Sequence, residues 1–208
     1  MKMMKTLVRP VAMALMMSAV GCVPSLHPLY TDQDVVFDPA LVGAWVEKSN
    51  TNTNQTWAFT RQSDKAYKLV YTDTEGKTGE FTAHLVNVAS NLFLDLYPDD
   101  LKLPQNDYYK AHWMPMHTFL RVWQIEPTLR MAVMEPVGLK RVLEAKPDAV
   151  RHEEVGTILL TASPKELQAF LLAHLDEKGV FGEPDDFARV IVLPAPGTNQ
   201  PPERGPAP

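Results

Sequence analysis

The residues best suited to chemistry lie in one short segment that runs from Tyr108 to His117. If this segment is extended, His112, Met114 and Met116 project to one side, with His117 close by. Thioether and imidazole groups suit Cu(I), so these four residues are candidate copper ligands. Met and His side chains also fill gaps between strands as ordinary packing. We expect packing to be the main role of this segment and keep copper binding as a lesser alternative.

No motif for covalent or phosphate chemistry accompanies this segment. The sequence has no Gly-x-Ser-x-Gly, no Ser-x-x-Lys and no His-Glu-x-x-His, and its glycines are scattered. His84, His152 and His174 each have surroundings typical of a surface or core histidine. We therefore expect a protein that is not an enzyme and that needs no cofactor.

The one cysteine of the chain, Cys22, directly follows a segment typical of a signal peptide. Two lysines and an arginine make the start of the chain positive, and no acidic residue precedes Cys22. The apolar stretch at 10–20 is too short to span roughly 30 Å of hydrocarbon as a helix. We therefore predict a cleavable signal peptide at residues 1–21.

The end of this segment, Ser18-Ala19-Val20-Gly21-Cys22, resembles the lipobox of bacterial prolipoproteins. In that motif a small residue precedes the cysteine, and cleavage leaves the cysteine at the new N-terminus. The sequence departs from the motif at Ala19, where Leu is usual. The resemblance implies that Cys22 is lipidated and attached to an envelope membrane. Lipidation would also consume a thiol that has no internal disulfide partner in an oxidising compartment.

The residue after the cysteine bears on the choice of membrane. Enterobacterial lipoproteins that stay at the inner membrane carry Asp there, whereas this chain has Val23. The resemblance therefore implies an outer-membrane protein that faces the periplasm. An ordinary secretory signal with an unrelated cysteine is the alternative.

Composition limits the partners and the domain organisation. The formal charge of −5 becomes −8 over 187 residues once residues 1–21 are removed, because three positive charges and no negative ones are lost. Such an acidic protein is a poor candidate for binding nucleic acid. We expect a lipidated N-terminus and tether at 22–38 and one folded domain at 39–193. The Pro-rich tail at 194–208 has little to bury and is expected to be disordered.

Between about residues 41 and 135, apolar side chains recur at alternate positions, as in half-buried strands. Short segments rich in turn-forming residues separate these runs. Closely spaced strands with hairpin-length connections favour an antiparallel meander, which usually hides its edges by closing into a barrel. The predicted strands are 41–46, 57–60, 67–72, 81–85, 92–96 and 119–125.

Helical patterns come late in the chain. Val137–Lys146 can form a short helix that ends before Pro147, and Ser163 begins a capping box that opens a second helix. A last strand at 187–193 would close the sheet. The sequence thus predicts a mainly β protein, a barrel of about eight antiparallel strands, with two helices in its C-terminal third.

The triplet Gly43-Ala44-Trp45 at the start of the first run resembles the Gly-x-Trp signature of lipocalins. In lipocalins this tryptophan plugs the closed end of the barrel and stacks on an arginine from a late strand. Arg189 or Arg121 could supply that arginine here. The sequence departs from a standard lipocalin in having two predicted helices after the seventh strand. The whole chain resembles lipocalin-like bacterial lipoproteins, a class from which no activity carries over.

The resemblance leaves two functions open. In one, the barrel binds a small apolar ligand or lipid near the membrane. In the other, the interior is fully packed and the outer surface contacts an envelope protein. Six aromatic residues would line or fill the interior in either case: Trp57, Phe59, Tyr67, Tyr71, Phe81 and Trp123.

Overall fold

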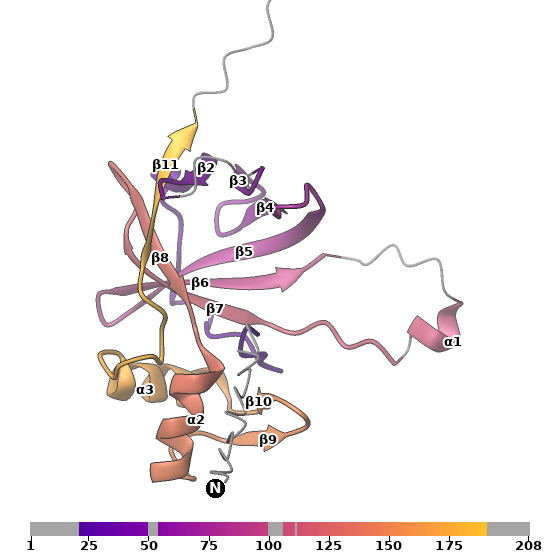
Figure 1. The fold of residues 1–208 in the computed structure, drawn as a ribbon, viewed down its shortest axis with the longest axis vertical. Coiled ribbons are helices and arrows are strands. Elements are labelled where there is room, and N and C mark those ends of the chain that lie inside the picture. Colours follow the sequence, from indigo (N-terminus) through magenta and orange to yellow (C-terminus); the bar gives the residue numbers. More distant parts are fainter. Residues whose placement is uncertain (1–20, 50–53, 100–105, 111, 191–208) are drawn as a thin grey trace, which may run out of the picture.

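The computed structural model describes residues 21–49, 54–99, 106–110 and 112–190. Within these ranges the chain forms a β-barrel with a layer of helices and a small hairpin on one side (Figure 1). Residues 1–20 of the predicted signal peptide and the predicted tail at 194–208 lie outside the described residues. No helix in the described part of the chain is long and apolar enough to cross a bilayer.

Eight antiparallel strands close the barrel. Seven of them follow one another as a meander, and β11 fills the gap between β8 and β2. Closure leaves the barrel without an open edge, and the predicted eight-stranded antiparallel barrel is confirmed. The barrel strands are β2 (Gly43–Glu47), β3 (Thr56–Arg61), β4 (Tyr67–Thr72), β5 (Thr78–Val88), β6 (Asn91–Pro98), β7 (Thr118–Gln124), β8 (Leu129–Val133) and β11 (Asp185–Val190).

Local chemistry fixes the hairpin between β4 and β5. The Asp73 carboxylate accepts backbone N–H bonds from Glu75 and Lys77, both at 2.8 Å. Gly76 has φ +81°, a conformation that glycine adopts without steric cost. This turn chemistry holds the register in which Tyr71 lies opposite Gly79.

One end of the barrel is closed by Trp45. Its side chain is fully buried, and its indole N–H donates to the carbonyl of Leu41 at 2.9 Å. Leu41 ends a short 3-10 helix, Pro39–Leu41, which lies directly before β2. The guanidinium carbon of Arg189 lies 4.4 Å from the centre of the indole ring. Of the two arginines considered from the sequence, Arg189 is therefore the one that stacks on the tryptophan.

Two more helices and a hairpin form a layer outside the barrel. The helices α2 (Pro136–Ala145) and α3 (Pro164–His174) confirm the two predicted helices; α2 agrees with its predicted bounds to within one residue, and α3 begins at the predicted capping box. In the α3 capping box, the Glu166 carboxylate accepts bonds from both the backbone and the hydroxyl of Ser163. The hairpin consists of β9 (His152–Glu154) and β10 (Ile158–Leu160).

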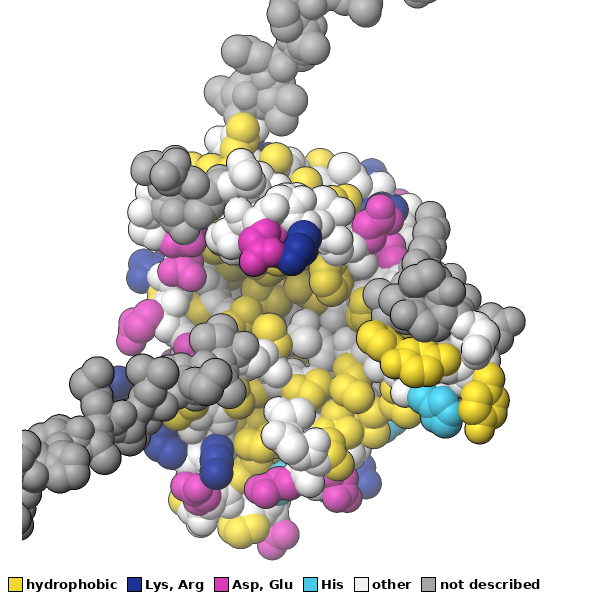
Figure 2. Space-filling view, turned by 45° about the vertical axis from the view of Figure 1, so that its right-hand side comes forward, with side chains coloured by type: hydrophobic (Ala, Val, Ile, Leu, Met, Phe, Trp, Pro, Cys, Tyr) yellow, Lys and Arg dark blue, Asp and Glu magenta, His cyan; other side chains and the backbone are white. Residues whose placement is uncertain are grey.

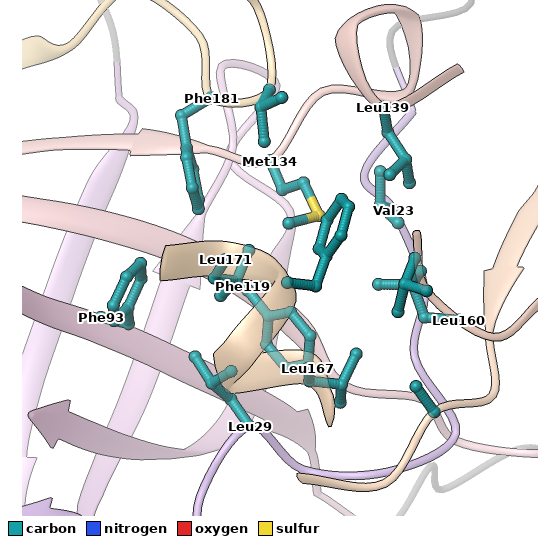
Figure 3. Packing of buried hydrophobic residues seen from close by; sticks show 14 of the residues in the cluster. Val23, Leu29, Phe93, Phe119, Met134, Leu139, Leu160, Leu167, Leu171 and Phe181 are labelled. Atoms are coloured by element: carbon teal, nitrogen blue, oxygen red, sulfur yellow. The ribbon is translucent and has the colours of Figure 1, made fainter. Parts of the chain in front are cut away.

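The protein has two hydrophobic cores. The barrel core fills the interior and contains Trp45, Phe59, Tyr67 and leucines from several strands. The outer core lies between the outer face of the barrel and the helical layer. Figure 3 shows it, with Phe93 and Phe119 from the barrel facing Leu167 and Leu171 of α3. Strands β5 to β8 contribute to both cores, so they bury side chains on both faces.

The segment that precedes the barrel is part of the fold, which differs from the predicted tether at 22–38. Val23 and Leu29 are buried in the outer core. Ser25 exchanges two backbone hydrogen bonds with His117, both at 2.9 Å. Strand β1 (Val35–Val36) then pairs with β5. The apolar residues of this segment are few and irregularly spaced, so the sequence shows no periodic pattern there.

Candidate functional site

The open end of the barrel is the end farther from the one that Trp45 closes. In antiparallel sheets, residues directly opposite each other share a face. Trp57 lies opposite Trp45, and Tyr71 lies opposite Trp57, so both point into the barrel. Phe187 of β11 is part of the barrel core. Figure 2 shows a recess lined largely by hydrophobic side chains on the side to which the β4–β5 and β6–β7 connections point.

Three aromatic rings form a wall at this end, which we call the aromatic wall: Trp57 and Tyr71 are partly buried, and Phe187 is buried. The ring centres of Trp57 and Tyr71 are 4.7 Å apart, and those of Trp57 and Phe187 are 6.3 Å apart. Across the barrel, Val133 lies opposite the buried Leu120 yet is 37% exposed. The interior therefore opens to its surroundings at this end, with apolar side chains at its rim.

The six aromatic residues expected in the interior have three different positions. Phe59 and Tyr67 are fully buried and fill the barrel core. Trp57, Tyr71 and Phe81 are partly buried and pack against that core.

Trp123 lies on the outer surface and is 39% exposed, so its predicted interior position is wrong. The guanidinium of Arg121 lies 4.7 Å from the centre of its ring. Leu120 and Val122 point into the barrel instead. Because the helical layer buries Phe119 on the outer face of β7, both faces are apolar there, and the alternation pattern does not reveal which face is the interior.

Polar groups border the aromatic wall. The indole N–H of Trp57 is buried and has no hydrogen-bond partner among the described residues. A buried N–H without a partner destabilises a protein by about 1–3 kcal/mol, so an acceptor brought by a ligand would relieve that cost. The Gln55 amide donates to the Tyr71 hydroxyl at 3.1 Å. Burial raises the pKa of Tyr71, and the charges of Asp73 and Cys22 raise it further.

Two carboxylates lie on the rim of the open end. Glu47 is opposite Phe187, and Asp185 is opposite the buried Met131, so both belong to the interior face. Burial raises the pKa of Asp185, and repulsion from Glu47 and Asp186 raises it further. Neither Glu47 nor Asp185 forms an ion pair with a described residue. The rim is therefore acidic and disfavours an anionic group.

Cys22, the predicted lipidation site, is exposed and reduced. Ser25, three residues later, pairs with His117 just before β7, so Cys22 lies near the point where the β6–β7 connection returns to the barrel. The next residue, Val23, is only 1% exposed.

Three of the four candidate copper ligands have other contacts or face solvent. The His117 ring nitrogen Nδ1 lies 2.7 Å from the carboxylate of Asp95. His112 lies against Tyr108, and Met114 is exposed to solvent. Among the described residues there is no group of three or more His, Cys, Asp or Glu side chains that could hold a metal ion.

Asp95 is a buried carboxyl group that sequence reasoning did not identify. One carboxylate oxygen accepts from the backbone N–H of Leu29 at 2.7 Å, and the other contacts His117. Asp95 alternates with leucines along β6, a pattern that is typical of a polar residue on the outer face of a barrel strand. Instead it joins the N-terminal segment to the start of β7. His84, opposite Asp95, has its pKa lowered by burial.

We compared the chain with known families, curated proteins and solved structures. None matches. Any functional assignment therefore depends on the chemistry of the residues themselves. The open end offers aromatic faces, an indole N–H and two carboxylates, a set suited to holding an apolar molecule that carries a small polar group.

Proposed function

We propose that this protein is a lipid-anchored, non-enzymatic envelope protein that binds a small apolar ligand or lipid at the open end of its barrel. The observation that carries the proposal is the aromatic wall inside that end, where the partly buried rings of Trp57 and Tyr71 lie beside the buried ring of Phe187. Aromatic rings left partly exposed in a concave site provide apolar contact area at little entropic cost.

The polar surroundings narrow the class of ligand. Glu47 and Asp185 make the rim acidic, so a ligand whose polar end is cationic or neutral is favoured over a fatty acid anion. A cation can also lie over the faces of Trp57 and Tyr71. An acceptor atom on the ligand would satisfy the indole N–H of Trp57.

The anchoring part of the proposal depends on Cys22 and the preceding segment. With its N-terminus modified by lipid at Cys22, the mature protein would be held at the periplasmic face of the outer membrane, as Val23 favours. Stable anchoring needs two or more acyl chains, which the lipobox resemblance implies.

The test is native mass spectrometry of residues 22–208 with Cys22→Ser, produced in a bacterial periplasm. We expect an adduct with the mass of a lipid. Tyr71→Ser should weaken the adduct, whereas Trp123→Ser on the outer surface should not. Among added ligands of equal chain length, an alkylamine should bind more tightly than an alkyl carboxylate. Protein that carries no adduct and binds neither added ligand would contradict the proposal.

The second candidate function is an interaction module that contacts an envelope protein. The deep part of the interior favours it, because Trp45, Phe59, Tyr67 and Leu69 fill the barrel near its closed end. A completely filled barrel would leave only the outer surface for binding. The same measurement separates the two candidates, since the interaction module predicts no adduct and no binding of either amphiphile.

A further inference from the structure

The β6–β7 connection carries an exposed cluster of large apolar side chains. We call its described residues, 106–110 and 112–117, the aromatic arm. Figure 1 shows the arm, including α1 (Asp107–Lys110), projecting from the body of the protein. The exposed fractions are 82% for Tyr108, 65% for Met114, and 49% for both Tyr109 and Trp113. Figure 2 shows hydrophobic side chains and a histidine gathered at this tip.

The residue types in the arm fit a bilayer interface. Tyrosine and tryptophan combine an apolar ring with a polar tip, and they concentrate at the boundary between lipid headgroups and hydrocarbon. Large apolar side chains clustered on a projection mark a binding surface. The acidic balance of the chain, −5 overall, does not favour attraction to anionic lipid, so apolar insertion would have to drive binding.

The start of the described chain lies beside the base of the arm. Ser25 pairs with His117 through two backbone hydrogen bonds, so the N-terminal segment is fixed where the arm returns to the barrel. Val23 is buried, and a chain advances by at most about 3.6 Å per residue. Cys22 is therefore held close to the body of the protein, beside the base of the arm.

We infer that the open end and the aromatic arm face a lipid bilayer, with Tyr108, Tyr109, Trp113 and Met114 inserted among the headgroups. A lipid on Cys22 would enter the bilayer at the same place. This inferred orientation rests partly on the proposed function, because contact between the open end and the membrane would let a ligand pass between bilayer and barrel without crossing water. The insertion of the arm itself does not depend on a ligand.

The single cysteine allows a direct test of this orientation. Residues 22–208 contain the described fold apart from Gly21, and Cys22 can be coupled to a maleimide lipid in phosphatidylcholine vesicles. Brominated lipids quench tryptophans that reach the hydrocarbon boundary. We expect quenching in the coupled protein, and we expect Trp113→Phe to abolish most of it. Trp123→Phe is the matched control and should leave the quenching unchanged.

A second measurement uses uncoupled protein with Cys22→Ser. The variant Tyr108→Ser/Trp113→Ser/Met114→Ser should bind these vesicles about tenfold more weakly or worse, because it loses several large apolar groups. Val137→Ser/Val155→Ser removes two exposed apolar residues from the helical layer and should bind as the parent does. Binding should be insensitive to salt, since apolar contacts drive it.

Equal quenching of the parent and Trp113→Phe, or equal vesicle binding by the two multiple variants, would overturn the inference. So would vesicle binding that disappears at high salt. Failure of the membrane-insertion proposal is distinguishable from failure of the proposed function, because the lipid adduct expected in native mass spectrometry does not require the arm. Thermal unfolding of each variant checks that the fold is retained.

Discussion

Trp45 and Arg189 show how single residues define the closed end of the barrel. Arg189 lies over the indole and donates hydrogen bonds to the carbonyls of Ala40 and Val42. Gly43 is required beside them, because its φ is +142° and a Cβ there would lie 2.5 Å from the guanidinium. The tryptophan, the arginine and the glycine thus form one structural unit.

The first prediction concerns Trp45. Trp45→Ala should lower the free energy of unfolding by about 3–5 kcal/mol, because it leaves a large cavity in the barrel core. Urea denaturation followed by far-UV circular dichroism measures the change. Trp123→Ala on the outer surface should cost less than about 1 kcal/mol. A similarly small loss at Trp45 would argue against its role in closing the barrel.

The second prediction concerns the arginine. Arg189→Met keeps an unbranched side chain but leaves the carbonyls of Ala40 and Val42 without a donor, so we expect a loss of about 1–3 kcal/mol. Arg130→Met is the control, since its ion pair with Asp186 is exposed and weak at 3.8 Å. Equal losses in the two variants, measured by urea denaturation, would contradict this account.

At the residue scale, the sequence predicted the position of a side chain best where a short motif is associated with one structural arrangement. The Gly-x-Trp triplet predicted a tryptophan stacked on a late arginine, and a stacked pair is found. It was least informative for Trp123, because both faces of β7 carry apolar residues. Trp57, Tyr71 and Phe81 were identified as interior aromatics, but only the register shows that they lie near the open end.

At the scale of elements, the helix α3 shows how a local signal and a tertiary contact combine. Its capping box satisfies backbone groups at the N-terminus, and Leu167, Phe170 and Leu171 face the outer core. Arg151 also donates to the Glu166 carboxylate. These hydrogen bonds lower the pKa of Glu166 from its ordinary value of 4.5 to about 2, chiefly through the Ser163 hydroxyl.

The third prediction follows from that pKa. The folded state binds a proton at Glu166 less readily than the unfolded state does. The ionised Glu166 carboxylate therefore stabilises the folded state fully above pH 4.5, and this contribution is lost as the pH falls toward about 2. Glu166→Gln should therefore flatten the decline of the melting temperature across this range. Glu154→Gln on β9 should leave the decline unchanged. If the melting temperature of Glu166→Gln declined with falling pH as steeply as that of the wild type, the prediction would be contradicted.

The elements that the sequence missed share a physical reason. Strands β1, β9 and β10 have two or three residues each, too few for an alternating pattern to emerge. The N-terminal segment lies against the barrel through single anchors such as Val23 and Leu29. By contrast, strands of the meander and the capped helix carry periodic or capping signals that can be read without tertiary information.

At the scale of the whole molecule, the two hydrophobic cores share one wall. Strands β5 to β8 pack against the barrel core on one face and against the outer core on the other. Neither core can be lost without exposing an apolar face of the same strands. The barrel and the helical layer should therefore behave as one cooperative unit.

The fourth prediction tests this coupling. Leu69→Ala in the barrel core and Leu171→Ala in the outer core should each lower the stability by about 2–5 kcal/mol. In both variants, near-UV and far-UV circular dichroism should report one urea transition with coincident midpoints. Two separate transitions in Leu171→Ala would show that the helical layer unfolds independently.

The burial of Val23, one residue after Cys22, also sets an order of events in biosynthesis. An enzyme that acylates Cys22 or cuts the Gly21–Cys22 bond must grip extended chain on both sides of that bond. Val23 cannot be gripped once it lies in the outer core. If Cys22 is processed as we propose, processing must come before the final step of folding. A chain that folded too early would be trapped as an uncleaved precursor, so delayed folding during export would favour maturation.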